Sequence, residues 1–154
     1  MDTSLLYKIA IRVIRKYQSL LGISTLGARA IVLNQAEEIL LVKHTYQPHW
    51  YIPGGGVKRG ESVKAALLRE LQEEVGITVL EEPQLLGVYH HNYLGVNDYP
   101  IIYVIDNFSL TPARSPEIEQ IGWFAYNSLP EMTSPGTRRR LDEYFTKSLV
   151  AEKW

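Results

Sequence analysis

The sequence contains no cysteine in its 154 residues. Disulfide bonds, thiolate zinc sites and a cysteine nucleophile are therefore all excluded, and the absence fits a reducing compartment. An excess of charge of one sign is lacking too, because the formal net charge at pH 7 is -1. A chain with so little net charge has no general attraction for polyanions, so we expect no nucleic-acid partner, and a local site must hold any bound anion.

Long apolar runs are also missing. Basic residues interrupt the apolar segment near the N terminus, and no secretory cleavage pattern follows it, so we expect no transmembrane segment and a cytoplasmic location. The chain has 45% apolar and 21% charged residues, the composition of one globular domain with a sizeable core. We place this domain at residues 27–154 and treat residues 1–26 as an N-terminal helical extension.

The extension has the pattern of an amphipathic helix. Four basic residues are interspersed in it, and its apolar side chains recur at helical spacing, at Leu6, Ile9, Ala10, Val13, Ile14, Tyr17, Leu20 and Leu21. Most stripes of this kind pack on their own domain, which is our first expectation. The alternatives are a helix that rests on anionic lipid and a helix that forms a homodimer contact.

Beyond Gly22 the apolar residues follow the period of strands. Short runs rich in β-branched and aromatic residues, bounded by turn residues, predict strands at residues 28–33, 39–43, 50–52, 77–80, 85–94, 100–108 and 121–126. The first two runs suggest a strand-turn-strand unit. The runs at 85–94 and 100–108 suggest an antiparallel pair with its turn at residues 95–98.

Two further helices are expected in the domain. Residues 62–75 have apolar side chains at three- and four-residue steps, with Ser62 as N-cap and Gly76 as terminator. Near the C terminus Ser134 can cap a helix and Pro135 suits its first turn. The predicted buried stripe of this last helix is Leu141, Tyr144, Phe145 and Leu149, and its run of three arginines at 138–140 is expected to be solvated.

Three carboxylates on the helix at 62–75 indicate chemistry. Glu70, Glu73 and Glu74 stand at i, i+3 and i+4, so they project from one face of the helix and repel one another. An acidic solvated face is the ordinary explanation of a glutamate-rich helix. The other explanation is a hard divalent cation, which takes carboxylate, carbonyl and water oxygens and leaves room for substrate phosphates.

The surroundings of the three carboxylates favour the cation. The preceding loop contains Gly54, Gly55 and Gly56, so the backbone can approach a ligand closely and present a carbonyl to it. Glu61 and Arg69 lie where an acid and a guanidinium can hold the carboxylates in position through charge-assisted hydrogen bonds.

The whole segment resembles a known family signature. Counting from Gly55, five residues precede Glu61, seven more precede Arg69, and the string closes as Arg-Glu-Leu-Gln-Glu-Glu-Val-Gly-Ile at Ile77. This is similar to the complete Nudix box, with no departure at its specified positions. The resemblance covers residues 27–150 and implies an α/β (α+β) fold, the Nudix-type αβα sandwich with a mixed sheet, here with an additional N-terminal amphipathic helix.

The resemblance also implies an activity. Nudix enzymes are metal-dependent hydrolases of a pyrophosphate bond in a nucleoside diphosphate linked to a group X. On this chain the implied ligands of Mg²⁺ or Mn²⁺ are Glu70, Glu73 and Glu74, with the Gly55 carbonyl. The cation would neutralise the diphosphate and lower the pKa of the attacking water, and the implied catalytic residues are Arg69, Glu70, Glu73 and Glu117.

The sequence leaves the identity of the general base open. Some family members use a box glutamate, here Glu70, and others use a glutamate from a later loop. Glu117 and Glu119 are the later candidates in this sequence. A lone loop glutamate is also often only solvated.

The substrate is not specified by the box. Tyr46, Trp50 and Tyr93 are aromatic candidates for stacking a base, and Gly54 and Gly55 are candidates for backbone contacts with substrate. Nucleotide sugars, ADP-ribose, dinucleoside polyphosphates and nucleoside triphosphates are all open as substrates. The alternative is a Nudix-fold module that binds a nucleotide without turnover, although such a module has no need of three repelling glutamates.

Overall fold

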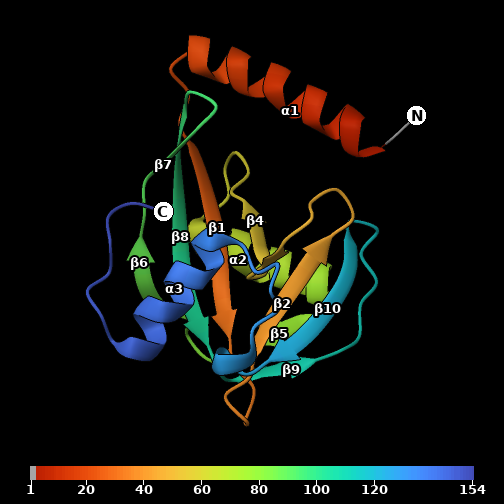
Figure 1. The fold of residues 1–154 in the computed structure, drawn as a ribbon, viewed down its shortest axis with the longest axis vertical. Helices are drawn as coiled ribbons and strands as arrows, with labels where there is room; N and C mark the ends of the chain where they lie inside the picture. Colours follow the sequence, from red (N-terminus) through yellow and green to blue (C-terminus); the bar gives the residue numbers. More distant parts are fainter. Residues whose placement is uncertain (1–2) are drawn as a thin grey trace.

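The computed structural model describes residues 3–154, with side chains from Leu5 onward (Figure 1). The three α-helices are α1 (Thr3–Leu20), α2 (Val63–Val75) and α3 (Pro135–Thr146). The strands are β1 (Thr25–Val32), β2 (Ile39–His44), β3 (Trp50–Tyr51), β4 (Gly54–Gly56), β5 (Ile77–Val79), β6 (Gln84–Val88), β7 (His91–Tyr93), β8 (Val96–Ile105), β9 (Phe108–Leu110) and β10 (Ile118–Phe124). A short 3₁₀ helix, η1 (Tyr126–Ser128), follows β10.

The largest sheet is mixed. Its strand order is β4-β1-β8-β6, with β7 pairing along the first part of β8. β1 and β8 are parallel over eight residue pairs, and the other pairs of this sheet are antiparallel. A smaller antiparallel sheet has the order β10-β2-β3, and β5 pairs with β9.

The strands of the sheet separate two cores, as the alternation of side chains along a strand requires. On one face Ala28, Ala30 and Val32 of β1 join Leu67 and Leu71 of α2 in one buried cluster. On the other face Ile31 belongs to a second cluster that includes Ile102 of β8 and Leu141 of α3. The expected αβα sandwich with a mixed sheet is therefore confirmed.

The strand-turn-strand unit expected at residues 28–43 is present as β1 and β2, and its pairing and the turn before β8 are seen only in the structure. β1 and β2 do not form a hairpin: β1 pairs with β4 and β8, β2 pairs with β10 and β3, and only a single bridge joins Leu33 to Ile39. The β7–β8 turn lies at Leu94 and Gly95, which have φ values of 53° and 82°, so it precedes the expected position at residues 95–98. The antiparallel pairing of β6 and β7 with β8 is as predicted.

The C-terminal helix is shorter than expected. Ser134 is its N-cap and Pro135 lies in its first turn, as predicted. The helix ends at Thr146 because Lys147 adopts a left-handed conformation with φ 52°. Leu149 therefore lies outside the helix with 95% of its surface exposed, and its prediction as a buried residue was wrong.

The run of arginines on α3 is also not wholly solvated. Arg138 and Arg139 are exposed, whereas Arg140 has none of its surface exposed. Its guanidinium carbon lies 3.9 Å from the centre of the Tyr89 ring, and Nη2 donates to Glu143 Oε1 at 2.8 Å. Arg140 is thus a core residue.

Helix α1 corrects the first expectation for the N-terminal stripe. Its apolar residues are exposed rather than packed on the domain, among them Leu6 (45%), Val13 (64%) and Tyr17 (64%). Figure 1 shows α1 lying across one end of the molecule, beyond the β7–β8 turn and β4. In the described part of the chain, residues 3–154, no helix is both long and apolar enough to cross a membrane.

Candidate active site

Helix α2 places three glutamates at the edge of the sandwich. Ser62 accepts a hydrogen bond from the Ala65 amide at 3.1 Å and fixes the start of the helix. Gly76 ends it in the left-handed conformation, with φ 70°. The helix predicted over residues 62–75 is therefore confirmed, and Glu70, Glu73 and Glu74 share one of its faces.

The glycine loop lies directly against these glutamates. β4 pairs antiparallel with β1, opposite Ala28 and Arg29. The Gly54 amide donates to Glu74 Oε2 at 2.9 Å, and a Cβ on Gly55 would lie 2.6 Å from Glu70 Oε1. A side chain at position 55 would therefore displace the Glu70 carboxylate, and glycine lets the loop lie directly on the helix.

Arg69 organises the exposed side of the cluster. Its guanidinium contacts Glu61 at 2.8 Å, Glu70 at 2.7 Å and Glu73 at 3.2 Å. The hydrogen bond from Arg69, with a second from the Lys58 amide, lowers the pKa of Glu61 to about 2. These are the charge-assisted contacts that the sequence predicted for Glu61 and Arg69.

Glu74 is the buried member of the cluster, with 6% of its surface exposed. Burial raises its pKa to about 7, against the opposing effects of the Gly54 amide and Arg29, while the charges of Glu70 and Glu117 raise it further. His44 Nε2 lies 4.0 Å from Glu74. Burial lowers the pKa of His44 to about 4, so this imidazole is neutral at pH 7 and cannot serve as the counter-charge.

The four candidate carboxylates line one cavity of about 450 Å³, together with Lys58, Arg69 and Arg114. Glu70, Glu73 and Glu74 come from α2, and Glu117 comes from the loop before β10. Glu119 does not line this cavity, and its carboxylate pairs with Lys43 at 3.3 Å. Of these two glutamates, only Glu117 therefore joins the cluster.

The donor set of this cavity fits a hard divalent cation, because carboxylate oxygens and the nearby loop carbonyls are the ligands such cations take. Among residues 3–154, His44 is the one basic side chain within ion-pair distance of the buried Glu74 carboxylate, and its imidazole is neutral at pH 7. Over the same range, no three acidic or histidine side chains already converge on a common point. Arg69 instead holds Glu70 and Glu73, so cation binding would require these two side chains to shift.

The three predicted aromatic residues have different environments. Tyr46 stacks on Tyr7 of α1 with ring centres 4.2 Å apart, and burial raises the pKa of its phenol. Trp50 packs edge-on against Phe124, with ring centres 5.1 Å apart, and lies against the buried cluster that includes Leu141 of α3. Tyr93 is 41% exposed. None of the three lines the carboxylate cavity, and their role in substrate binding stays a prediction.

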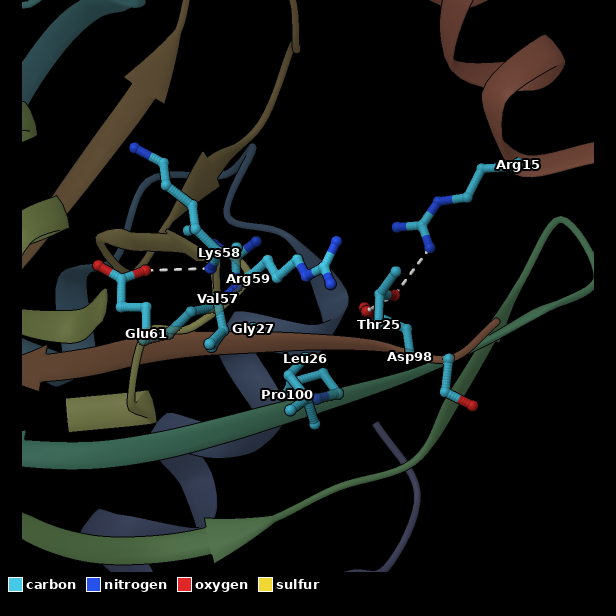
Figure 2. Close-up of a pocket in the computed structure, with 14 residues that line it drawn as sticks. Arg15, Thr25, Leu26, Gly27, Val57, Lys58, Arg59, Glu61, Asp98 and Pro100 are labelled. Atoms are coloured by element: carbon cyan, nitrogen blue, oxygen red, sulfur yellow. Dashed lines mark hydrogen bonds between the residues drawn. The ribbon is translucent and has the colours of Figure 1, made fainter. Parts of the chain in front are cut away.

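A second cavity, of about 470 Å³, was missed by the sequence analysis (Figure 2). It lies between α1 and the glycine loop, and Lys58 lines both cavities. Arg15, Arg29, Lys58 and Arg59 line it against two acids, Glu61 and Asp98. Glu61 already binds Arg69, and the Asp98 carboxylate accepts from Thr25, which in turn accepts from Arg15 at 2.9 Å.

One signal could have identified part of this cavity from the sequence. Arg29 is a charged residue inside a strand whose neighbours Ala28 and Ala30 are fully buried. Charge in such a strand is uncommon unless it faces a ligand or a partner. Arg15 had no such signal, because it looked like any other basic residue of α1.

Comparisons with known proteins agree with this geometry. The family model described as the NUDIX domain matches residues 24–145. A protein of Bacillus subtilis (strain 168) named "Putative 8-oxo-dGTP diphosphatase" is 32% identical over 120 residues, which are 78% of this chain and 79% of that protein. The crystal structure of a MutT NUDIX hydrolase from Burkholderia pseudomallei superposes with a TM-score of 0.69 at 32% identity, over 77% of this chain and 96% of the other.

A more distant structure shows the fold alone. The MutT protein from Methanosarcina mazei Go1 superposes with a TM-score of 0.72 at 21% identity, over 80% of this chain and 94% of the other. With the family match and the 32% relatives, the chain belongs to the Nudix hydrolase family. As a member of that family it is a pyrophosphohydrolase, in a family that generally uses divalent metal ions.

Proposed function

We propose that this protein hydrolyses, in the cytoplasm, the pyrophosphate bond of a small nucleoside diphosphate linked to a group X, with Mg²⁺ or Mn²⁺ as cofactor. The observation that carries the proposal is the cavity lined by Glu70, Glu73, Glu74 and Glu117, which adjoins a cationic cavity through Lys58. Oxygen ligands for a cation on one side and positive charge on the other are what a diphosphate ester needs.

The residues that would hold the cation are Glu70, Glu73 and Glu74, with the Gly55 carbonyl. When bound, the cation supplies positive charge at the diphosphate and promotes the ionisation of water. The chain's own residues do the positioning. Arg69, itself held by Glu61, positions Glu70 and Glu73, and the Gly54 amide holds Glu74, so that only the two carboxylates bound by Arg69 would have to shift when a cation binds.

The basic residues of the cationic cavity would neutralise the phosphate charge of the substrate that the metal ion does not. Among the described residues 3–154, the Lys58 and Arg59 side chains form no ion pair within 4.0 Å, and both line this cavity. They are available to a phosphate. Damaged nucleoside triphosphates, dinucleoside polyphosphates, ADP-ribose and nucleotide sugars all carry such phosphates, and the relative from Bacillus subtilis is named for the first class.

The base of the substrate has one well-placed aromatic partner. Tyr93 lies at the end of β7, and the guanidinium carbon of Arg15 lies 5.5 Å from the centre of its ring. Because Arg15 also lines the cationic cavity, Tyr93 is linked to this cavity through Arg15, and its ring is a candidate face for a base. All three aromatic candidates already have an aromatic partner, which is Tyr7 for Tyr46, Phe124 for Trp50 and His91 for Tyr93, so the contact of Tyr93 with Arg15 is what favours Tyr93.

A substrate panel tests the function. We expect the full chain with Mg²⁺ or Mn²⁺ to release phosphate, pyrophosphate or nucleoside monophosphate from at least one of 8-oxo-dGTP, diadenosine tetraphosphate, ADP-ribose and a nucleotide sugar. The Glu73→Gln variant, which lacks one ligand, serves as the inactive reference. If nucleotides bind but neither protein turns any of them over, the chain is the non-catalytic nucleotide-binding module and the proposal fails.

We propose Glu117 rather than Glu70 as the general base. Glu70 is held by Arg69 at 2.7 Å and packs against Gly55, whereas Glu117 lines the same cavity without an ion-pair partner within 4.0 Å among residues 3–154. Replacing Glu117 with glutamine should lower kcat by about 10² to 10⁴-fold, the contribution typical of a positioned base.

A pH profile separates a base from a ligand or a positioning residue. The Glu117→Gln variant should lose the acidic limb of the kcat profile, while its KM for the metal-bound substrate stays within about threefold. If Glu117→Gln keeps the acidic limb and Glu70→Gln loses it, Glu70 is the base and our assignment is wrong.

A further inference from the structure

Helix α1 has three faces that differ in what they contact. The first face packs against the domain. It contains the half-buried residues Tyr7, Ile11, Arg15 and Gln18, which are three or four residues apart. Tyr7 stacks on Tyr46, and Arg15 reaches Thr25 and the Tyr93 ring. These contacts fix how the helix is rotated about its axis, and therefore which face points away from the domain.

The second face is apolar and uncovered. Its large side chains are 45–77% exposed, and they are Leu5, Leu6, Ile9, Val13, Ile14, Tyr17 and Leu20. Leu21, Ile23 and Leu94 extend the apolar surface beyond the end of α1, with exposures of 56%, 43% and 46%. An apolar surface of this size on a globular protein marks an interaction site.

The third face is a row of positive charge. Lys8, Arg12 and Lys16 follow one another at four-residue steps, so they lie on one line along the helix, and all three are exposed. Each of these basic residues comes directly after one of Tyr7, Ile11 and Arg15, and successive residues of a helix are rotated by 100° about its axis. The row therefore lies beside the face that contacts the domain, between that face and the apolar face. The segment Thr3–Leu20 contains no acidic residue.

We propose that α1 is a docking site for an anionic lipid surface. The helix would lie in the plane of the interface with its apolar side chains among the acyl chains and the Lys8, Arg12 and Lys16 row at the headgroups, the arrangement of interfacial amphipathic helices. Charge complementarity selects this occupant. A second copy of α1 would bring the row of three exposed basic residues close to its counterpart, with no acid on either helix to pair them, and like charges brought together destabilise such a contact.

Binding to vesicles tests the proposal on the full chain. We expect it to cosediment with vesicles of 70% phosphatidylcholine and 30% phosphatidylserine, less so at high salt, and at least about tenfold more weakly with phosphatidylcholine alone. The triple variant Lys8→Gln, Arg12→Gln, Lys16→Gln should lose about 100-fold in partitioning, since each basic residue near an anionic surface contributes about fivefold. Val13→Asp should also weaken binding, because it introduces charge into the apolar face.

A matched variant controls for net charge. Arg138, Arg139 and Lys147 are exposed on or next to α3, and replacing all three with glutamine changes the charge by the same amount without touching α1. This variant should bind the anionic vesicles within about twofold of the unaltered chain. Equal binding of the two triple variants, or no binding of the unaltered chain, would overturn the proposal.

The molecular mass of the protein without lipid tests whether a second copy of the chain, rather than lipid, covers the apolar face. We expect the same molecular mass for the unaltered chain and for Val13→Asp by light scattering at micromolar concentration. A dimer that Val13→Asp dissociates would show that a second copy covers the apolar face, and the lipid proposal would fail.

Discussion

Replacing Glu74 with glutamine should lower kcat/KM at least about 100-fold, because it removes the charge of the buried carboxylate that we propose as a metal ligand while keeping its shape. The Gly54 amide, which donates to Glu74 Oε2 at 2.9 Å, can still find an acceptor on the glutamine. The loss should therefore appear in turnover and in metal affinity rather than in folding. Steady-state kinetics with titrated Mg²⁺ and Mn²⁺ measure both.

The same substitution should raise the stability of the metal-free protein at pH 8. The folded-state pKa of Glu74 is raised to about 7, so ionisation favours the unfolded chain as pH rises from the unfolded value of about 4.5 through 7. Glutamine does not ionise, and the variant should lose less of its melting temperature between pH 5 and pH 8 in EDTA. A variant that melts lower than the unaltered chain at pH 8 would contradict this account.

Glu119→Gln is the control for the Glu74 experiment. Glu119 lies two residues after Glu117 but outside the carboxylate cavity, where it pairs with Lys43. Its replacement should change kcat/KM by no more than about twofold, since an exposed ion pair of this kind contributes little. A large loss in this variant would mean that the cavity is not the reaction site.

Replacing Arg140 with methionine should destabilise the fold by about 3 to 5 kcal/mol, the cost of leaving one partner of a buried ion pair unmatched. Glu143 is 8% exposed and accepts hydrogen bonds from Arg140, from the Tyr89 hydroxyl at 2.8 Å and from the Ala151 amide at 3.1 Å. Without Arg140 its charge would have only neutral donors. For a chain of this length we expect the melting temperature to fall by about 10 °C.

Two further variants identify the cause of that loss. Arg139→Met changes the neighbouring, exposed arginine and should shift the melting temperature by less than about 2 °C. The double variant Arg140→Met, Glu143→Gln removes both charges and should recover part of the stability. If the double variant is no more stable than Arg140→Met, packing of Arg140 between Tyr89 and Trp154, rather than its charge, is what the fold requires.

Helix α2 could be predicted from the sequence because its signals are local. Ser62 and Gly76 fix its ends, and the apolar period fixes its buried face. The separation of β1 from β2 could not be predicted in the same way. It depends on the parallel pairing of β1 with β8, whose residues are about seventy positions away, and alternation along one strand does not reveal its partner.

The turn at Leu94 shows a different limit. A non-glycine residue at positive φ is uncommon, so nothing in the sequence marked Leu94 as a turn residue, and the turn was expected over residues 95–98. For α1, periodicity correctly identified an apolar stripe but not what it faces. Tyr7 and Arg15 decide the rotation of the helix through contacts with Tyr46 and Thr25, and nothing local to the helix indicates those partners.

In the active site, the box residues could be placed from the sequence because one helix and one loop carry them. The choice between Glu117 and Glu119 needed the structure, since it depends on how the chain enters β10. The pairing of β10 with β2 is irregular between Ile118 and Gln120, so alternation along that strand could not assign the two side chains to faces beforehand. The cationic cavity was missed because it combines α1 and β1 with the glycine loop and β8, which only the fold brings together.

Arg15 connects α1 to the cationic cavity. Its side chain lines the cationic cavity and bonds to Thr25, while its backbone belongs to the helix whose opposite face is uncovered. A ligand in the cavity that moved α1 through Arg15 into a state with a different affinity for a partner of its outer face would be coupled to that partner, and reciprocity would then require the reverse effect to have the same magnitude. Under the two proposals above, a nucleotide in the cavity and a lipid surface on α1 would then act as heterotropic effectors of each other.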